Sequence, residues 1–246
     1  MTDQADLPEV PRERVLIPGG TGGVGEGIVR AWLATGADVV VPTRSDERAA
    51  QFRSVLGAAA TERLHLVVHD YTTFAGAEEL ARQITDRLGG IDHVVAPIGG
   101  WWSGRGLREI DEHDWQRAFV DLSTAHMAVA RAAVPLLPKT GTYTVVVGAS
   151  ATWPVPGSGL VSMEQAAVLM LHRVLAAEES GGARTFALVL GPVDTRNAQG
   201  GAGQITADQV GRIARSLAAD RSRPFGVVDL TTPDEIATAL DRTDAR

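Results

Sequence analysis

The sequence contains no cysteine, which excludes disulfides, thiolate catalysis, cysteine-based zinc sites and iron–sulfur clusters. Lysine is nearly absent as well, since Lys139 is the single lysine among 23 basic residues. No segment has the roughly 18 consecutive apolar residues of a membrane-spanning helix. The net charge of -7, without a basic block, argues against nucleic acid or an anionic membrane as the main partner.

What is present is the composition of an ordinary globular protein, with 44% hydrophobic and 22% charged residues. A chain of 246 residues can form one large α/β domain. Residues 1–14 are polar and acidic and lack the basic-then-apolar pattern of a signal peptide, so we expect a flexible N-terminus and a cytoplasmic protein. We expect one domain over residues 15–232 and a tail over residues 233–246.

Short apolar runs alternate with helical patterns along the chain. Strands are predicted at 15–17, 39–41, 64–68, 93–96, 142–147, 185–190 and 226–230, and helices at 27–33, 45–56, 75–88, 111–137, 161–179 and 207–219. Buried strands that alternate regularly with helices are typical of a parallel sheet covered on both faces. The sequence therefore predicts a single doubly wound α/β domain.

A glycine-rich turn at residues 18–25 joins the first predicted strand to the first helix. Glycines in this place let the backbone approach a pyrophosphate, which binds free N–H groups at the helix N-terminus. The turn resembles the TGxxxGxG motif of the short-chain dehydrogenases/reductases, and this implies a Rossmann-type dinucleotide site. The candidate contacts in the turn are Gly19, Thr21, Gly22, Gly23, Val24 and Gly25.

The resemblance extends over residues 15–230 and implies further cofactor contacts. Asp70 follows the third strand, where the family places an aspartate that contacts adenine, and Gly99 keeps the glycine of the family's Asn-Asn-Ala-Gly motif. Residues 191–195 resemble the family's Pro-Gly-x-Val-x-Thr segment, with leucine in place of the first proline. In the family this segment holds the nicotinamide, which assigns that role to Gly191, Val193 and Thr195.

Cofactor choice depends on the end of the second strand, where a site for NAD usually has a carboxylate and a site for NADP a cation. Here the residues are Thr43 and Arg44, and no carboxylate is present. The planar guanidinium of Arg44 suits a phosphate, although a solvated surface arginine would leave the same pattern. We therefore expect NADP(H) in preference to NAD(H).

The catalytic tyrosine of the family, and the lysine four residues after it, are both missing. Aligning the helix at 161–179 with the family's active-site helix places Val161 at the tyrosine and Gln165 at the lysine, and a shift by two residues restores neither. The two tyrosines of the chain are Tyr71 and Tyr143, which lie elsewhere. The usual proton donor is therefore absent.

Two other residues are candidates for the chemistry. Ser150 could be the family's serine or could cap a strand end, although it lies two residues closer to Val161 than is usual. Asp121 stands where the family has an asparagine, either as an acid or base in a desolvated pocket or as a structural residue of its helix. The histidines show no metal-ligand spacing, so we expect no metal, and His126 is interpreted as a packing or surface residue.

Three tryptophans follow the fourth and fifth strands, at the sheet edge where open α/β sheets bind ligands. Trp101, Trp102 and Trp153 would suit a flat aromatic or polycyclic substrate, or alternatively packing or a subunit interface. The predicted helices at 111–137 and 161–179 are apolar nearly all round, and the family typically pairs them between subunits. We therefore expect a homodimer or homotetramer.

Three functions fit these features. The first is an atypical NADP(H)-dependent oxidoreductase that reduces a bulky or aromatic small molecule without the tyrosine and lysine. The second is a non-redox cyclase, dehydratase or isomerase on the same fold. The third is a catalytically silent nucleotide-binding subunit. The intact glycine turn favours the first over the second, and the missing pair favours the third.

Overall fold

The computed structural model of the protein describes residues 12–178, 181–198, 201, 203–223 and 225–244. At its centre lies a sheet in which all neighbouring strands are parallel, in the order β3-β2-β1-β4-β5-β6-β9. The strands are β1 Arg14–Leu16, β2 Asp38–Thr43, β3 Leu64–Val68, β4 His93–Ala96, β5 Thr142–Gly148, β6 Arg184–Leu190 and β9 Phe225–Leu230. The predicted parallel sheet is confirmed.

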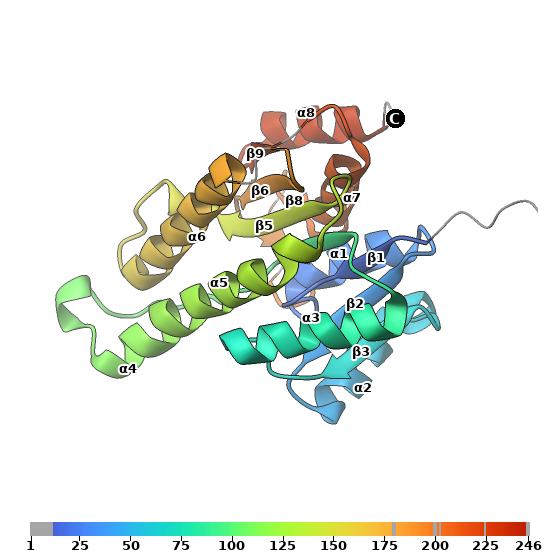
Figure 1. Cartoon of the computed structure of the whole chain (residues 1–246). Helices are drawn as coiled ribbons and strands as arrows, with labels where there is room; N and C mark the ends of the chain where they lie inside the picture. Colours follow the sequence, from blue (N-terminus) through green and yellow to red (C-terminus); the bar gives the residue numbers. More distant parts are fainter. Residues whose placement is uncertain (1–11, 179–180, 199–200, 202, 224, 245–246) are drawn as a thin grey trace, which may run out of the picture.

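Helices cover both faces of this sheet (Figure 1). One apolar core contains residues of α1 Gly23–Leu33, α2 Asp46–Leu56, α7 Ala207–Ala219 and α8 Pro233–Asp244. The other core contains residues of α3 Phe74–Leu88, α5 Asp121–Ala133 and α6 Gly159–Glu178. Side chains of successive strand residues enter opposite cores, so the doubly wound α/β fold is confirmed.

The strand order reverses between β1 and β4, and this switch point places the loops that follow these two strands side by side. Gly19, in the turn after β1, has a φ of +83°, and a Cβ atom there would lie 2.4 Å from the carbonyl oxygen of Pro97. Only glycine permits both this conformation and this approach. Ligands of open α/β sheets bind at such a switch point.

The ends of the chain differ from the prediction. Residues 1–11 of the expected flexible N-terminus lie outside the described residues, and Arg14 already belongs to β1, where it pairs with Asp92 at 2.8 Å. The expected C-terminal tail is wrong, because residues 233–244 form α8, with Ile236 buried in the core. The helix starts at a capping box in which Glu235 N–H donates to Thr232 Oγ1 and Thr232 N–H donates to the Glu235 carboxylate.

The helix predicted at 111–137 is confirmed in extent but is not uniform. It comprises α4 Glu112–Trp115, the π-helical turn η3 Gln116–Val120, α5, and the 3₁₀ turn η4 Val134–Leu136. The 3₁₀ helices η1 Gly57–Ala59, η2 Leu107–Glu109 and η5 Ala149–Ala151, and the short strands β7 Val193–Asp194 and β8 Ile205–Thr206, were not predicted. π-helical turns occur frequently at functional sites, and this one directly precedes Asp121.

Among the described residues, α6 is long and apolar enough to cross a membrane by length and composition. A third of its most apolar stretch, 33%, is buried inside the protein. The helix packs on β5, β6 and α5, and core helices of globular proteins meet the same criteria. The apolar side chains that it leaves exposed include Met163, Met170 and Val174.

Helices α1 and α7 cross at two glycines, and a substitution at one of them tests this packing. A Cβ atom on Gly27 would lie 2.0 Å from the carbonyl oxygen of Ala207, and one on Gly211 would lie 2.3 Å from the carbonyl oxygen of Gly27. We expect Gly27→Ala to destabilise the protein by about 1–3 kcal/mol through overpacking. Gly106→Ala, at an exposed position with open space around it, should change stability by less than about 0.5 kcal/mol. Urea unfolding of both variants measures this, and equal stabilities would contradict it.

Candidate cofactor and active site

The turn after β1 leaves the start of α1 open to an anion. The N-cap residue Gly22 makes no side-chain capping bond. Thr21, Gly22, Gly23, Val24 and Gly25 all lie in this turn or in the first turn of α1. The backbone N–H groups of this turn thus lie at the N-terminus of α1, where the helix dipole favours negative charge.

A cation that the sequence analysis missed lies against the same turn. Arg196 donates to the carbonyl oxygen of Thr21 at 2.8 Å and pairs with Glu26 of α1. Arg196 immediately follows Thr195 in the segment that resembles the nicotinamide-binding motif. Its position next to that motif was the available signal, although a guanidinium beside the turn could not be read from spacing.

The two cofactor segments predicted at opposite ends of the chain meet in the structure. A Cβ atom on Gly23 would lie 3.0 Å from both Cβ and Oγ1 of Thr195. The Thr195 hydroxyl accepts from the backbone N–H groups of Asn197 and Ala198, at 3.2 and 3.1 Å. Val193 lies in β7, and Gly191 donates from its N–H to the carbonyl oxygen of Leu230 at 3.0 Å. The predicted pyrophosphate and nicotinamide segments thus form one continuous surface.

The residues predicted for the adenosine half lie at the ends of β2 and β3. Asp70 accepts from the Thr72 N–H and hydroxyl, and these bonds, with a smaller effect of the Arg44 charge, lower the pKa of the Asp70 carboxyl. Arg44 is exposed and therefore free to meet a phosphate. Thr43 differs from the expectation, because its side chain is buried and its hydroxyl is enclosed by protein.

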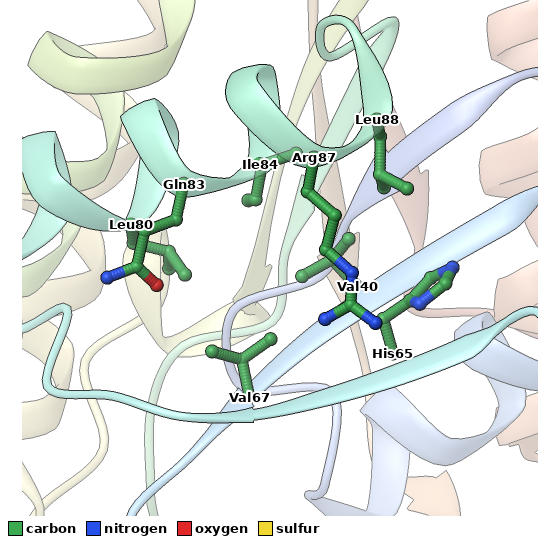
Figure 2. A pocket seen from close by; sticks show the side chains of 8 residues that line it. All are labelled: Val40, His65, Val67, Leu80, Gln83, Ile84, Arg87 and Leu88. Atoms are coloured by element: carbon green, nitrogen blue, oxygen red, sulfur yellow. The ribbon is translucent and has the colours of Figure 1, made fainter.

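The surface formed by the described residues includes two hollows that bear on the site. One of about 450 Å³ lies beside Gly23 and is lined by α1, by residues 194–196 and by the start of α7. The other, of about 60 Å³, lies between α3 and strands β2 and β3, where Arg87 reaches toward His65 (Figure 2). Ligand pockets are usually about 300–1,000 Å³, so the second hollow is too small for a nucleotide.

At the end of β5 the structure brings together three residues around the expected catalytic position. Gly148 N–H donates to Oε1 of Gln165 on α6. A Cβ atom on Gly148 would lie 3.0 Å from this Oε1 atom and 3.6 Å from the Ser150 hydroxyl oxygen. Gly148 is also the residue at the usual serine spacing from Val161, which is buried on α6. Gln165 and Ser150 therefore face the same strand end.

Asp121 lies apart from this group. Its carboxylate is exposed at the start of α5 and accepts from Gln116 Nε2 at 2.7 Å. Of the two alternatives for Asp121, the structure thus shows the hydrogen-bonded residue of a helix, whereas the carboxyl of Glu164 is buried, with 1% of the residue exposed. The buried carboxyl group therefore lies on α6, and the exposed one lies on α5.

Glu164 and His126 form a buried pair that sequence reasoning missed. Glu164 Oε1 lies 3.9 Å from Nε2 of His126, and this Nε2 atom is 3.0 Å from the carbonyl oxygen of Ile98, just after β4. Burial raises the pKa of the Glu164 carboxyl to about 7 and lowers the pKa of the His126 imidazole to about 4. Among the residues that the structure describes, neither Glu164 Oε1 nor His126 Nδ1 has a hydrogen-bond partner. The Glu164 carboxyl is therefore protonated below about pH 7, a range in which an ordinary carboxyl is largely ionised, while the His126 imidazole stays neutral above about pH 4.

The three tryptophans lie on two loops that are joined. Gly104 N–H donates to the carbonyl oxygen of Gly157 at 2.9 Å, which links the loop after β4 to the loop before α6. Trp101 and Trp153 are 69% and 71% exposed, whereas Trp102 donates to Asp114 at 3.3 Å. The exposed indole rings of Trp101 and Trp153 are therefore free to meet a ligand.

Within the described part of the chain, one group of residues could hold a metal ion by geometry, namely Asp111, His113 and Asp114 near α4. Asp111 already caps α4 by accepting from Asp114 N–H, and it pairs with Arg105 at 2.7 Å. Exposed acidic groups of this kind are common at helix starts. The group therefore carries no metal assignment.

A parallel sheet with this switch point, a glycine cradle before α1 and a threonine segment facing it define a Rossmann-type nucleotide-binding protein. A family model described as "Enoyl-(Acyl carrier protein) reductase" matches residues 19–240. The chain belongs to this family and to the short-chain dehydrogenase/reductase superfamily.

Individual relatives have low sequence identity to this chain. A "Hydroxysteroid 11-beta-dehydrogenase 1-like protein" from Xenopus tropicalis is 26% identical over 63% of this chain and 54% of its own length. A "Cis-2,3-dihydrobiphenyl-2,3-diol dehydrogenase" from Paraburkholderia xenovorans is 26% identical over 68% of this chain and 60% of its own length. The chain thus spans little more than half the length of these curated relatives.

The fold is also found among solved structures. A short chain dehydrogenase from Burkholderia cenocepacia, in complex with NADP, aligns with a TM-score of 0.78 at 21% identity. The alignment covers 92% of this chain and 100% of the other. At this identity the likeness establishes the fold.

The buried carboxyl of Glu164 predicts a pH-dependent stability. Its folded pKa of about 7 exceeds the ordinary value of 4.5, so the folded state binds more protons between these pH values and the free energy of unfolding falls as pH rises through them. His126, with its lowered pKa, acts in the opposite direction between about pH 4 and 6.5. The difference between the parent protein and Glu164→Gln isolates the carboxyl.

Relative to Glu164→Gln, we expect the parent to lose about 3 kcal/mol of stability between pH 4.5 and 7. Urea unfolding at a series of pH values measures this. Glu178→Gln, at an exposed position of the same helix, is the matched control and should follow the parent. Parallel curves for the parent and Glu164→Gln would show that Glu164 titrates normally.

Proposed function

We propose that this protein is an NADP(H)-dependent oxidoreductase that reduces a bulky or aromatic small molecule without the tyrosine and lysine of its superfamily. The contact between Gly23 and Thr195 carries the proposal, because it assembles the two cofactor segments next to the uncapped start of α1. When bound, the nucleotide would supply hydride. The turn would hold its pyrophosphate, and residues 191–195 would orient its nicotinamide.

The preference for NADP(H) is supported by charge. Arg44 is exposed at the end of β2, where a 2′-phosphate would lie, and no carboxylate stands there to accept from a ribose hydroxyl. Solved structures with this fold include an NADP complex and, for a blue fluorescent protein from a metagenomic library, an NADPH complex. A guanidinium binds phosphate through two parallel N–H donors.

The proposed substrate class follows from the two exposed tryptophans. Trp101 and Trp153 lie on joined loops beyond the ends of β4 and β5, where flat rings could stack on a planar molecule. The names of two relatives refer to a hydroxysteroid and a dihydrobiphenyl diol, both of which are large and cyclic. Such molecules would match an aromatic rim.

A silent nucleotide-binding subunit is the second candidate function, and one observation favours it. Helix α6 contains neither tyrosine nor lysine, and apolar Val161 occupies the position that the resemblance gives to the proton donor. Such a subunit would bind NADPH but would not oxidise it with any acceptor. Turnover with a planar quinone, 9,10-phenanthrenequinone, decides between the two candidates.

The test of the cofactor assignment is Arg44→Ala. We expect NADPH binding to weaken about 10- to 100-fold, because the loss of a charge-assisted contact costs about 1.5–3 kcal/mol. NADH binding should be unchanged. Calorimetry with both nucleotides measures the two affinities, and Arg48→Ala on exposed α2 is the control. Equal affinities of the parent for NADPH and NADH would refute the preference.

We also propose that the protein assembles as a homodimer or homotetramer through α5 and α6. These helices expose Met127, Met163, Met170 and Val174 by 41–52% of their surface, which leaves an apolar stripe in the isolated chain. Apolar stripes of this kind mark interfaces between subunits.

We therefore expect light scattering at micromolar concentration to show a dimer or tetramer. The double substitution Met170→Glu/Val174→Glu should reduce the mass to that of the monomer, because it places two charges in the proposed interface. Gln51→Glu, on exposed α2, should leave the assembly intact. A monomeric parent would refute the proposal.

A further inference from the structure

We propose that Glu164 is the proton donor of this site and that His126 positions it, so that the pair replaces the missing tyrosine and lysine. The inference rests on the proposed reductase function. Three observations support it. The pair lies near the loop after β4, and both residues are buried. The Nε2–H group of His126 faces two acceptors, the carbonyl oxygen of Ile98 and Oε1 of Glu164.

The first support for the inference is the position of Glu164 on α6. Glu164 lies on α6 directly before Gln165, whose side chain reaches Gly148 at the end of β5. On its other side, Glu164 lies 3.9 Å from His126, which is bonded to the carbonyl oxygen of Ile98 after β4. The carboxyl therefore lies near the loop after β4, at the edge where an open parallel sheet presents a ligand to catalytic groups.

Burial of the pair favours the protonated form of the Glu164 carboxyl. Glu164 and His126 are each 1% exposed, so ionising either one alone would place a charge in a poorly solvated space. Besides Glu164, the titratable or charged residues on α6 and on the elements packed against it are His126, Asp121, Arg131, Arg117, Tyr143, Arg184, His172, Arg173 and Glu178. Within the described part of the chain, His126 is the one of these for which a contact with Glu164 within 4 Å is found. Below about pH 7 the carboxyl therefore keeps its proton until negative charge develops on the substrate oxygen.

His126 offers a single N–H to two acceptors. Its Nε2 atom lies 3.0 Å from the carbonyl oxygen of Ile98 and 3.9 Å from Glu164 Oε1. While Glu164 is neutral, the carbonyl is the better placed acceptor. Once Glu164 has given up its proton, the carboxylate becomes the stronger acceptor, since hydrogen bonds to charged groups are about twice as strong as neutral ones. A small turn of the imidazole would then stabilise the carboxylate.

The proposed step is the addition of a hydride and a proton to a carbonyl group of the substrate. When bound, NADPH would supply a hydride with its two electrons to the carbonyl carbon of the substrate, and the π pair of the C=O bond would move to the oxygen. The O–H bond of Glu164 breaks, its electron pair stays on the carboxylate, and the proton forms the hydroxyl of the product. Water later returns a proton to Glu164. General acid catalysis of this kind contributes about 10²–10⁴-fold to the rate.

The test uses the full chain with NADPH and 9,10-phenanthrenequinone. We expect kcat of the parent to be constant below about pH 7 and to fall tenfold per pH unit above it. Glu164→Gln should lower kcat about 100-fold or more and abolish this bend, with an unchanged Kd for NADPH. His126→Phe should move the bend to higher pH, because the carboxylate loses its donor. Glu178→Gln should behave as the parent.

A second readout does not depend on turnover. The ¹³C resonance of the Glu164 carboxyl carbon, identified by its loss in Glu164→Gln, should titrate near neutral pH in the parent and at higher pH in His126→Phe. A resonance that titrates at an ordinary carboxyl pH would overturn the inference. So would a Glu164→Gln variant that keeps the parent's kcat and bend, although the reductase function would then stand. A parent that binds NADPH but never oxidises it refutes the reductase function itself.

Discussion

The close approach of the Gly19 turn to the backbone at Pro97 is the constraint on which the site depends. A single methyl group on Gly19 would lie within 2.4 Å of the Pro97 carbonyl oxygen, so the two loops at the switch point touch through bare backbone. This contact fixes the cofactor turn relative to the loop after β4. Ile98 follows Pro97 directly, and its carbonyl oxygen holds His126. The nucleotide cradle and the buried proton pair are thus anchored on adjacent residues.

Much of the fold could be predicted because its signals are local. The periodicities of strands and helices depend on neighbouring residues, and so does the glycine turn between β1 and α1. The structure confirms the doubly wound sheet that these signals indicate. The misassigned C-terminal tail also had a local signal. Thr232-Pro233 followed by Glu235 is a helix start, and these residues cap α8 through two reciprocal bonds.

The site was harder to predict because its important contacts are between distant segments. The burial of Thr43 and the position of Arg196 against Glu26 depend on how strands and loops pack, and motif spacing does not encode this. His126 is buried, as a packing residue would be, but no motif spacing links it to Glu164. Val161 and Gln165 stand where the resemblance places the catalytic pair, and no motif spacing singles out Glu164, which lies between them in sequence.

Stability alone does not account for the buried carboxyl on α6. An enclosed carboxyl oxygen without a hydrogen-bond partner destabilises a fold, and the neighbouring imidazole is itself left with an unpartnered nitrogen. Leucine or methionine at residue 164 would fill similar space at no such cost, as happens when buried ionisable groups are replaced by apolar ones. Buried groups that reduce stability are frequent at sites where chemistry needs a shifted pKa. In a helix that lacks tyrosine and lysine, Glu164 is therefore the group whose burial is best explained by a proton that must be held and then released.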